Sequence, residues 1–184
     1  MDPKKTPKTF VAFLRGINVG GHHKVPMADL RQEMEKLGFQ KVATLLNSGN
    51  IIFEAPTHKP EHLEKTIADH LEQVFGFPIP TLVRSAKTLE QLYKENPFQK
   101  MEVTKDIRLY VSFLKNDPAV ELDLPWASAD HSYRILDVRD KTILSVLNLA
   151  VSNTPKAMEA LEQFFGKEIT TRNWKTVERV VKKL

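Results

Sequence analysis

Two short stretches of the chain gather residue types that bind anions. The first, FLRGINVGGHHKVPM from Phe13 to Met27, places glycines and Lys24 between an apolar run and the start of a helix. Glycines let a backbone approach a ligand closely, and clustered N–H groups beside a cation form an anion-binding concavity. The second, TTRNWKTV from Thr170 to Val177, sets an arginine and hydroxyl groups around a tryptophan. Such a guanidinium forks a phosphate or carboxylate, and an indole offers a stacking face.

Each stretch also has a purely structural interpretation. GINVGGHHK matches neither a Walker loop nor a dinucleotide fingerprint, and a connection that needs positive φ at Gly20 and Gly21 explains its glycines. Trp174 also suits a core position beside a capped helix, with Arg172 in an internal salt bridge. A third stretch, NSGN from Asn47 to Asn50, is typical of a hairpin turn. The candidate ligand-binding residues are Arg15, Gly16, Asn18, Gly20, Gly21, Lys24, Ser48, Asn50, Arg172, Asn173, Trp174 and Thr176.

The sequence offers little support for catalysis or for a metal. His22 and His23 are adjacent, so on any regular element their side chains point apart, and no third ligand follows at metal-site spacing. We find no catalytic-triad order, no Gly-x-Ser-x-Gly elbow and no His-Glu-x-x-His motif. We therefore predict no metal and no cofactor, and we lean against an enzyme while leaving that question open.

The composition is that of an ordinary soluble protein. Of the 184 residues, 41% are hydrophobic and 27% are charged, and no apolar run approaches the ~20 residues that span a bilayer. The first nine residues, MDPKKTPKT, are not followed by an apolar segment long enough for a secretory signal. The chain has no cysteine, which excludes disulfides and thiolate metal sites. We therefore predict a cytoplasmic protein without membrane contact.

The net charge of +4 is concentrated at the C-terminal end. Residues 165–184 carry the excess alone, so the rest of the chain is neutral. A basic segment can meet nucleic acid or another anion. It can also be a solvated helix end whose lysines complement the helix dipole. The basic residues of this segment are Lys167, Arg172, Lys175, Arg179, Lys182 and Lys183.

The first half of the chain follows a β-α-β-β-α-β order, which is the ferredoxin-like pattern. Residues 9–16 form an apolar run that ends in glycine, as a strand does, and residues 26–39 follow with a helical apolar face and a terminating Gly38. Residues 41–55 are two apolar runs joined by NSGN. Residues 59–76 form a second helix whose stripe we expect to be Leu63, Ile67, Leu71 and Val74. Residues 78–85 form a fourth strand, and Pro78 and Pro80 indicate either an edge strand or an irregular start.

The second half repeats the first. LEQVFG at 71–76 recurs as LEQFFG at 161–166, and VAFLR at 11–15 resembles VSFLK at 111–115. The segment KNDPAVELDLPWASAD, where the first helix of the second copy would fall, contains two prolines and scattered acidic residues, which leave at most a short helix there. We therefore predict an α+β fold of two ferredoxin-like (βαββαβ) halves with antiparallel sheets, related by internal duplication, and a C-terminal helix. The predicted divisions are a flexible N-terminus over 1–8, a first half over 9–86, a linking helix over 87–100 and an irregular second half over 101–184.

Two local expectations follow from this pattern. Ser85 and Asn173 occupy matching places before helices, where we expect them to act as N-caps. We also expect the Arg15–Lys24 loop and the NSGN hairpin to lie at opposite ends of their sheet, so that they would not share one small pocket.

The same residues resemble a bacterial family of uncharacterised proteins, domain of unknown function 1697. The resemblance rests on LRGINVGG, KVPMADLR, SGNIIF and TTRNWKTV and extends from about residue 9 to 180. It implies an α+β fold with ferredoxin-like halves and no established activity. Lys175 stands where the family usually has asparagine, and HHK stands where NK is common.

These observations leave three functional hypotheses. The first is a non-catalytic binding protein for an anionic ligand, a nucleotide or a nucleic acid, that uses Arg15, Lys24, Arg172 and Trp174. The second is an enzyme acting on a small phosphorylated or carboxylated metabolite held between the halves. The third is a protein-interaction module that presents a sheet face. The sequence predicts neither the ligand nor the oligomeric state.

Overall fold

The computed structural model describes residues 6–56 and 59–184, which divide into two units. Unit 1 comprises Met1–Gln91 with Val180–Leu184, and unit 2 comprises Leu92–Arg179. Helix α3 (Ala86–Glu95) and helix α5 (Trp174–Val181) each cross a boundary between the units. The predicted flexible N-terminus lies mostly outside the described residues.

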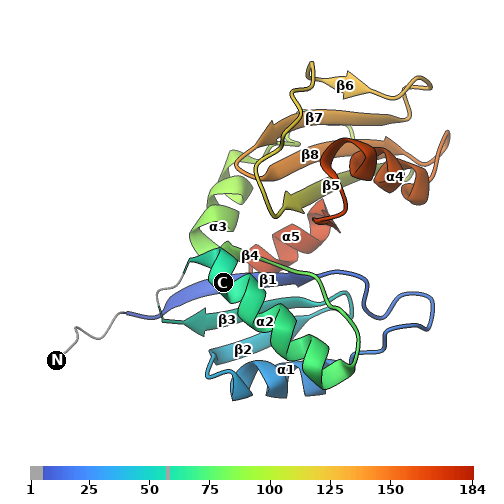
Figure 1. Ribbon diagram of the computed structural model, residues 1–184. Helices are drawn as coiled ribbons and strands as arrows, with labels where there is room; N and C mark the ends of the chain where they lie inside the picture. The colour runs from blue at the N-terminus through green and yellow to red at the C-terminus, as the bar shows by residue number, and fades with distance from the viewer. Residues whose placement is uncertain (1–5, 57–58) are drawn as a thin grey trace. The chain divides into compact units, whose positions relative to one another are not determined.

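Unit 1 is built on a four-stranded antiparallel sheet (Figure 1). The strands are β1 (Lys8–Leu14), β2 (Gln40–Leu45), β3 (Asn50–Ala55) and β4 (Thr81–Ser85), in the spatial order β2-β3-β1-β4. β1 and β3 are therefore the central pair, and β4 is an edge strand, which is one of the two alternatives that Pro78 and Pro80 indicated.

Helices α1 (Met27–Lys36) and α2 (Pro60–Phe75) cover one face of this sheet (Figure 1). Each ends where glycine adopts positive φ, at Gly38 and Gly76, which confirms the predicted helix stops. Their apolar stripes pack on Phe10, Ala12 and Leu14 of β1. Val74 is an exception to the predicted stripe of α2, because it is exposed near the helix end. The buried helix residues are Leu30, Met34, Leu63, Ile67 and Leu71.

Unit 2 is built on a five-stranded antiparallel sheet with the order β6-β7-β8-β5-β9. The strands are β5 (Ile107–Leu114), β6 (Trp126–Ala127), β7 (Tyr133–Arg139), β8 (Thr142–Asn148) and β9 (Ile169–Asn173). Helix α4 (Thr154–Phe165) packs on one face through Ala157 and Leu161. The β7–β8 hairpin turns at Asp140 and Lys141, which both have positive φ.

The segment between β5 and β7 contains no helix, only the two-residue strand β6. Its prolines and scattered acidic residues remove the apolar stripe that a helix needs to bury. Unit 2 therefore departs from the strand-helix-strand order of unit 1 at the place where the sequence was irregular. No helix in the described part of the chain is long and apolar enough to cross a bilayer.

Candidate functional site

The loop between β1 and α1 is held closed by the side chain of Asn18. Its amide nitrogen donates to the carbonyl oxygens of Val25 and Asn47, both at 2.9 Å, and its amide oxygen accepts from the Val25 N–H at 2.8 Å. Asn18 has a left-handed φ of 55°, which asparagine tolerates better than most residues. Both N–H groups of this amide and one lone pair of its oxygen are therefore used inside the protein, and Asn18 fastens the loop to the start of α1 and to the β2–β3 turn.

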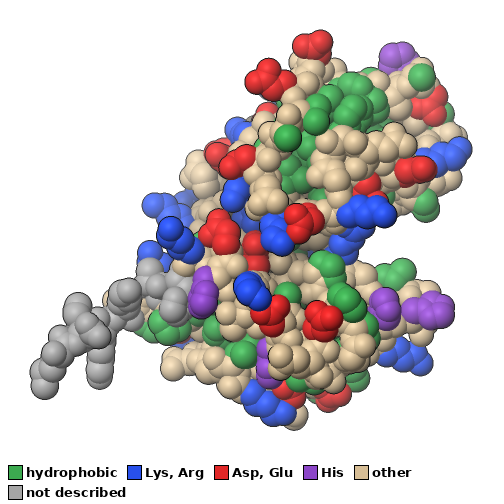
Figure 2. Space-filling model, viewed as in Figure 1, with side chains coloured by type: hydrophobic (Ala, Val, Ile, Leu, Met, Phe, Trp, Pro, Cys, Tyr) green, Lys and Arg blue, Asp and Glu red, His purple; other side chains and the backbone are tan. Residues whose placement is uncertain are grey.

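The glycines of this loop form the tip of the turn. The His22 N–H donates to the Val19 carbonyl at 3.1 Å, across Gly20 and Gly21, which both have positive φ. His23 stacks on Phe77 with 4.3 Å between ring centroids. Figure 2 shows histidine and cationic side chains grouped over the loop. The turn accounts for the two glycines without a ligand.

The NSGN hairpin has an equally structural role. The buried Asn50 side chain donates to the Leu45 carbonyl at 2.8 Å and to the Ser48 hydroxyl at 3.0 Å. The Gly49 carbonyl accepts from the Leu14 N–H at 2.8 Å. These contacts tie the hairpin to the end of β1.

The expectation that this hairpin and the β1–α1 loop lie at opposite ends of the sheet was wrong. β1 and β2 are each antiparallel to β3, so they run in the same direction. The C-terminal ends of both strands therefore lie at the same end of the sheet. The loop after β1 and the turn after β2 therefore meet, as the bond from Asn18 to Asn47 shows. They share a shallow hollow of about 400 Å³ that also includes Lys24 and the start of α1.

Replacing Asn18 with alanine is expected to lower the free energy of unfolding by about 1–3 kcal/mol, because buried backbone groups of Val25 lose their partner. Asn18→Gly keeps the left-handed backbone free of strain but lacks the amide, so it should also destabilise the protein. Amide hydrogen exchange of Val25 should be faster in both variants. If Val25 exchanges at the wild-type rate in Asn18→Gly, the side-chain amide of Asn18 does not hold the loop in place.

In unit 2, the candidate Arg172 lies inside the sheet. It is 8% exposed, and its Nη1 donates to the Thr170 hydroxyl at 2.9 Å and the Thr171 carbonyl at 3.0 Å. Burial lowers the pKa of its guanidinium to about 10. Arg172 therefore serves the interior of unit 2 in this structure, and its side chain is not among those that line the hollow described below.

Trp174 and Asn173 form the junction between β9 and α5. Trp174 is 6% exposed, with its ring centroid 5.4 Å from Phe98 and 6.3 Å from Tyr93. The Asn173 side chain accepts from the Lys175 N–H at 3.0 Å, and Ser85 accepts from the Thr88 N–H at 3.1 Å. Both predicted N-caps are confirmed.

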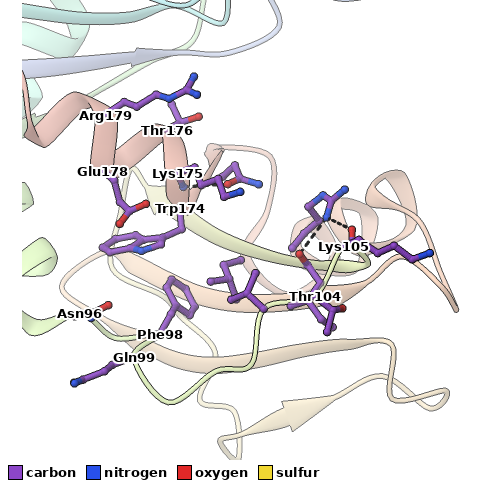
Figure 3. A pocket seen from close by; sticks show the side chains of 15 residues that line it. Asn96, Phe98, Gln99, Thr104, Lys105, Trp174, Lys175, Thr176, Glu178 and Arg179 are labelled. Atoms are coloured by element: carbon purple, nitrogen blue, oxygen red, sulfur yellow. Dashed lines mark hydrogen bonds between the residues drawn. The ribbon is translucent and has the colours of Figure 1, made fainter.

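A hollow of about 780 Å³ lies beside this junction, between the segment that leads into β5 and the exposed side of α5 (Figure 3). Phe98 and Trp174 turn their rings toward one another at its floor, and Leu109 is a further apolar residue of the lining. The residues that line it are Asn96, Phe98, Gln99, Val103, Thr104, Lys105, Ile107, Arg108, Leu109, Asn173, Trp174, Lys175, Thr176, Glu178 and Arg179. Three of the predicted site residues, Asn173, Trp174 and Thr176, thus come together.

The charged lining of this hollow is predominantly basic. Lys105 and Arg108 come from the segment before and at the start of β5, and Lys175 and Arg179 come from α5. Glu178 is the only acidic side chain among its lining residues. We call the whole hollow, with the lining residues given above, the α5 hollow, and its hydroxyl groups come from Thr104 and Thr176. It presents a net positive, hydroxyl-bearing surface that suits an anion.

The residues contributed by the start of β5 belong to no motif recognised in the sequence. Phe98, Lys105 and Arg108 lie in NPFQKMEVTKDIR, where an aromatic residue precedes spaced basic residues. That mixture of aromatic and basic residues is a weak signal on its own. It indicates a binding surface only because β5 and β9 are neighbours, which places the start of β5 beside the start of α5.

No group of histidine, cysteine, aspartate or glutamate in the described residues is arranged to hold a metal ion.

Comparison with known proteins identifies a family but no activity. Residues 8–143 match a family model described as a protein of unknown function, DUF1697. The match ends before β9, so it does not include TTRNWKTV. The structure is similar to that of the conserved bacterial protein SP0830 from Streptococcus pneumoniae. The two are 25% identical, the alignment covers 96% of this chain and 98% of that one, and the TM-score is 0.68. No curated protein matches the chain.

Proposed function

Because the chain belongs to the DUF1697 family of proteins of unknown function, whose description assigns no activity, we propose a function from the geometry of the α5 hollow. We propose that the protein binds an anionic ligand, a nucleotide or a nucleic acid, without catalysis. The observation that carries this proposal is the charge of the lining, with Lys105, Arg108, Lys175 and Arg179 against Glu178.

The basic side chains are available at the surface. Lys105, Lys175 and Arg179 are exposed, and Arg108 is half-buried. Arg108 Nη1 donates to the carbonyls of Lys105 and Ile107, at 2.7 and 3.1 Å, which holds its guanidinium at the rim. A preorganised guanidinium loses less side-chain entropy when it binds a phosphate than a free lysine does.

Size favours a nucleotide-like ligand over a single inorganic ion. A hollow of about 780 Å³ falls in the range that holds drug-sized ligands, and is far larger than one phosphate needs. Hydroxyl and amide groups of Asn96, Gln99, Thr104 and Thr176 line it beside the cations. These groups suit hydrogen bonds to sugar and phosphate oxygens.

Unit 1 contains two more of the candidate anion-binding residues, Lys24 and Arg15. Lys24 is exposed and lines the smaller hollow at the end of β1, and Arg15 begins the same loop. Asp29 lies in the first turn of α1, where its negative charge interacts favourably with the helix dipole. The same charge would repel an anion bound at this helix end. We therefore assign the main binding role to the α5 hollow.

The proposal is tested by amide NMR spectra recorded while a short single-stranded RNA, nucleotides and sugar phosphates are added in turn. Shifts should cluster at residues 96–109 and 173–179. In Lys175→Ala/Arg179→Ala the affinity should fall roughly 5- to 30-fold, since each exposed ion pair contributes up to about 1 kcal/mol. Lys156→Ala, an exposed cation on α4 outside the hollow, is the matched control and should bind normally. No shift with any probe would overturn the proposal.

We also propose that both units derive from one ferredoxin-like element by duplication. The strand order β2-β3-β1-β4 of unit 1 corresponds to β7-β8-β5-β9 of unit 2. LEQVFG and LEQFFG fall at the ends of α2 and α4, the corresponding helices. On this proposal the halves are 9–86 and 101–184, joined by residues 87–100, and unit 2 has lost its first helix. We place the protein in the cytoplasm on the basis of its cysteine-free sequence.

A further inference from the structure

We propose that the α5 hollow takes the sugar–phosphate backbone of a single-stranded nucleic acid and not a free nucleotide. The inference rests on the proposed function and names its ligand class.

The first argument is that the hollow has no place for a stacked base. Proteins that stack a base, whether of a free nucleotide or of a strand, do so on an exposed aromatic face. Phe98 is 4% exposed and Trp174 is 6% exposed, and their rings pack against one another. Trp174 also packs against Tyr93. These rings shape the floor but are buried against protein, so the hollow offers a ligand its charged and polar side chains, which suit a sugar–phosphate backbone, and no ring face for a base.

The second argument is the spread of the cations. Lys175 and Arg179 are four residues apart on α5, so they lie on one side of the helix about one turn apart. Lys105 lies on the other side of the hollow from Arg179, and Figure 3 shows the two side chains well separated and directed apart. A single phosphate is not expected to contact two side chains that are directed apart. A strand has one phosphate per nucleotide and can meet each cation in turn.

The third argument concerns what lies between the cations. Glu178 stands on α5 next to Arg179, and Figure 3 shows its carboxylate beside the indole of Trp174. A carboxylate there repels a phosphate and accepts a hydrogen bond from a sugar hydroxyl or a base amino group. The phosphates of a strand are therefore directed to the basic residues on either side. The cations lie on different elements around a hollow of about 780 Å³, and a flexible single strand can bend to follow them, whereas a duplex holds its phosphates on a stiff rod.

The test is fluorescence anisotropy with 5′-labelled 12-nucleotide oligo(U) and oligo(dT), at salt concentrations from 50 to 200 mM. We expect binding to both, because backbone contacts carry no sequence information. The logarithm of the affinity should fall against the logarithm of salt with a slope of about −2 to −3, since each contacted phosphate contributes about −0.7 for a single strand. In Lys175→Ala/Arg179→Ala the slope should become less steep by about 1.4. Lys156→Ala should leave it unchanged, and circular dichroism should show that both variants are folded.

The failures of the two proposals are distinguishable. Unlabelled ATP or pyrophosphate should compete far more weakly than an unlabelled 12-mer and a 3-mer more weakly than a 12-mer. If ATP competes as well as the 12-mer and the double variant loses both, the strand inference is wrong and the proposed function stands. If a matched duplex binds as tightly as the single strand, the strand inference is also wrong. If neither oligonucleotides nor ATP bind, or if the double variant binds as the wild type does, both proposals are wrong.

Discussion

Replacing Gly49 with alanine is expected to lower the free energy of unfolding by about 2–5 kcal/mol. Gly49 lies in the turn between β2 and β3 with a φ of +76°, which is strained for any residue with a Cβ. A Cβ at this position would lie 2.8 Å from the Leu14 Cβ and 2.8 Å from the Ile17 Cδ1. Both neighbours are buried, so they cannot move aside cheaply. The backbone strain and the steric overlap therefore add.

Gly21→Ala is the matched control for this variant. Gly21 has nearly the same φ, +79°, but a Cβ there meets nothing within 4 Å. It should therefore lose only the cost of the left-handed backbone, about 1–2 kcal/mol. Unfolding in urea should be followed by far-UV circular dichroism, because both tryptophans, Trp126 and Trp174, belong to unit 2 and do not report on the turn directly. Equal losses in the two variants would contradict the packing argument.

The elements were predictable from the sequence because each carried its own local signals. Gly38 and Gly76 mark the ends of α1 and α2, and apolar periodicity defines both helices. The NSGN turn predicts the β2–β3 hairpin from residues that tolerate positive φ. Local chemistry of this kind acts within a few residues, so it does not depend on how the strands are arranged in space.

The site was harder to predict because it depends on strand order. The β1–α1 loop and the β2–β3 turn were expected at opposite ends, although the antiparallel pairing of both β1 and β2 with β3 brings them together. Arg172 and Trp174 carried the strongest chemical signal in the sequence, but both are buried. Burial of an arginine or a tryptophan is decided by the residues packed around it, which a linear motif does not reveal. The exposed cations nearby, Lys175 and Arg179, stood out in the sequence only as members of the basic C-terminal segment, which a solvated helix end explains equally well.

Buried charge in unit 1 gives the other large expected effect. Glu64 on α2 accepts from the Val83 N–H at 2.9 Å and lies 3.5 Å from Nη1 of Arg84, with both side chains almost fully buried. Desolvation lowers the pKa of Arg84, and the charge of Glu64 opposes that shift. β4 is an edge strand, so this carboxylate also satisfies an N–H that no neighbouring strand accepts. One side chain thus serves both the sheet edge and the buried guanidinium.

Glu64→Ala should therefore cost about 3–5 kcal/mol of unfolding free energy, since it leaves a buried guanidinium without the carboxylate that contacts it. Asp69→Ala is the matched control on the same helix. Asp69 pairs with Lys65 at the surface, where both side chains are more than half exposed, so its loss should cost at most about 0.5 kcal/mol. Replacing Glu64 and Arg84 together with leucine and methionine should recover much of the loss, because the uncompensated charge is then absent. If Glu64→Ala costs no more than Asp69→Ala in urea unfolding, the buried pair does not stabilise unit 1. If Glu64→Ala is strongly destabilising but the double replacement does not recover stability, the hydrogen bond from the Val83 N–H to Glu64 contributes more than the ion pair with Arg84.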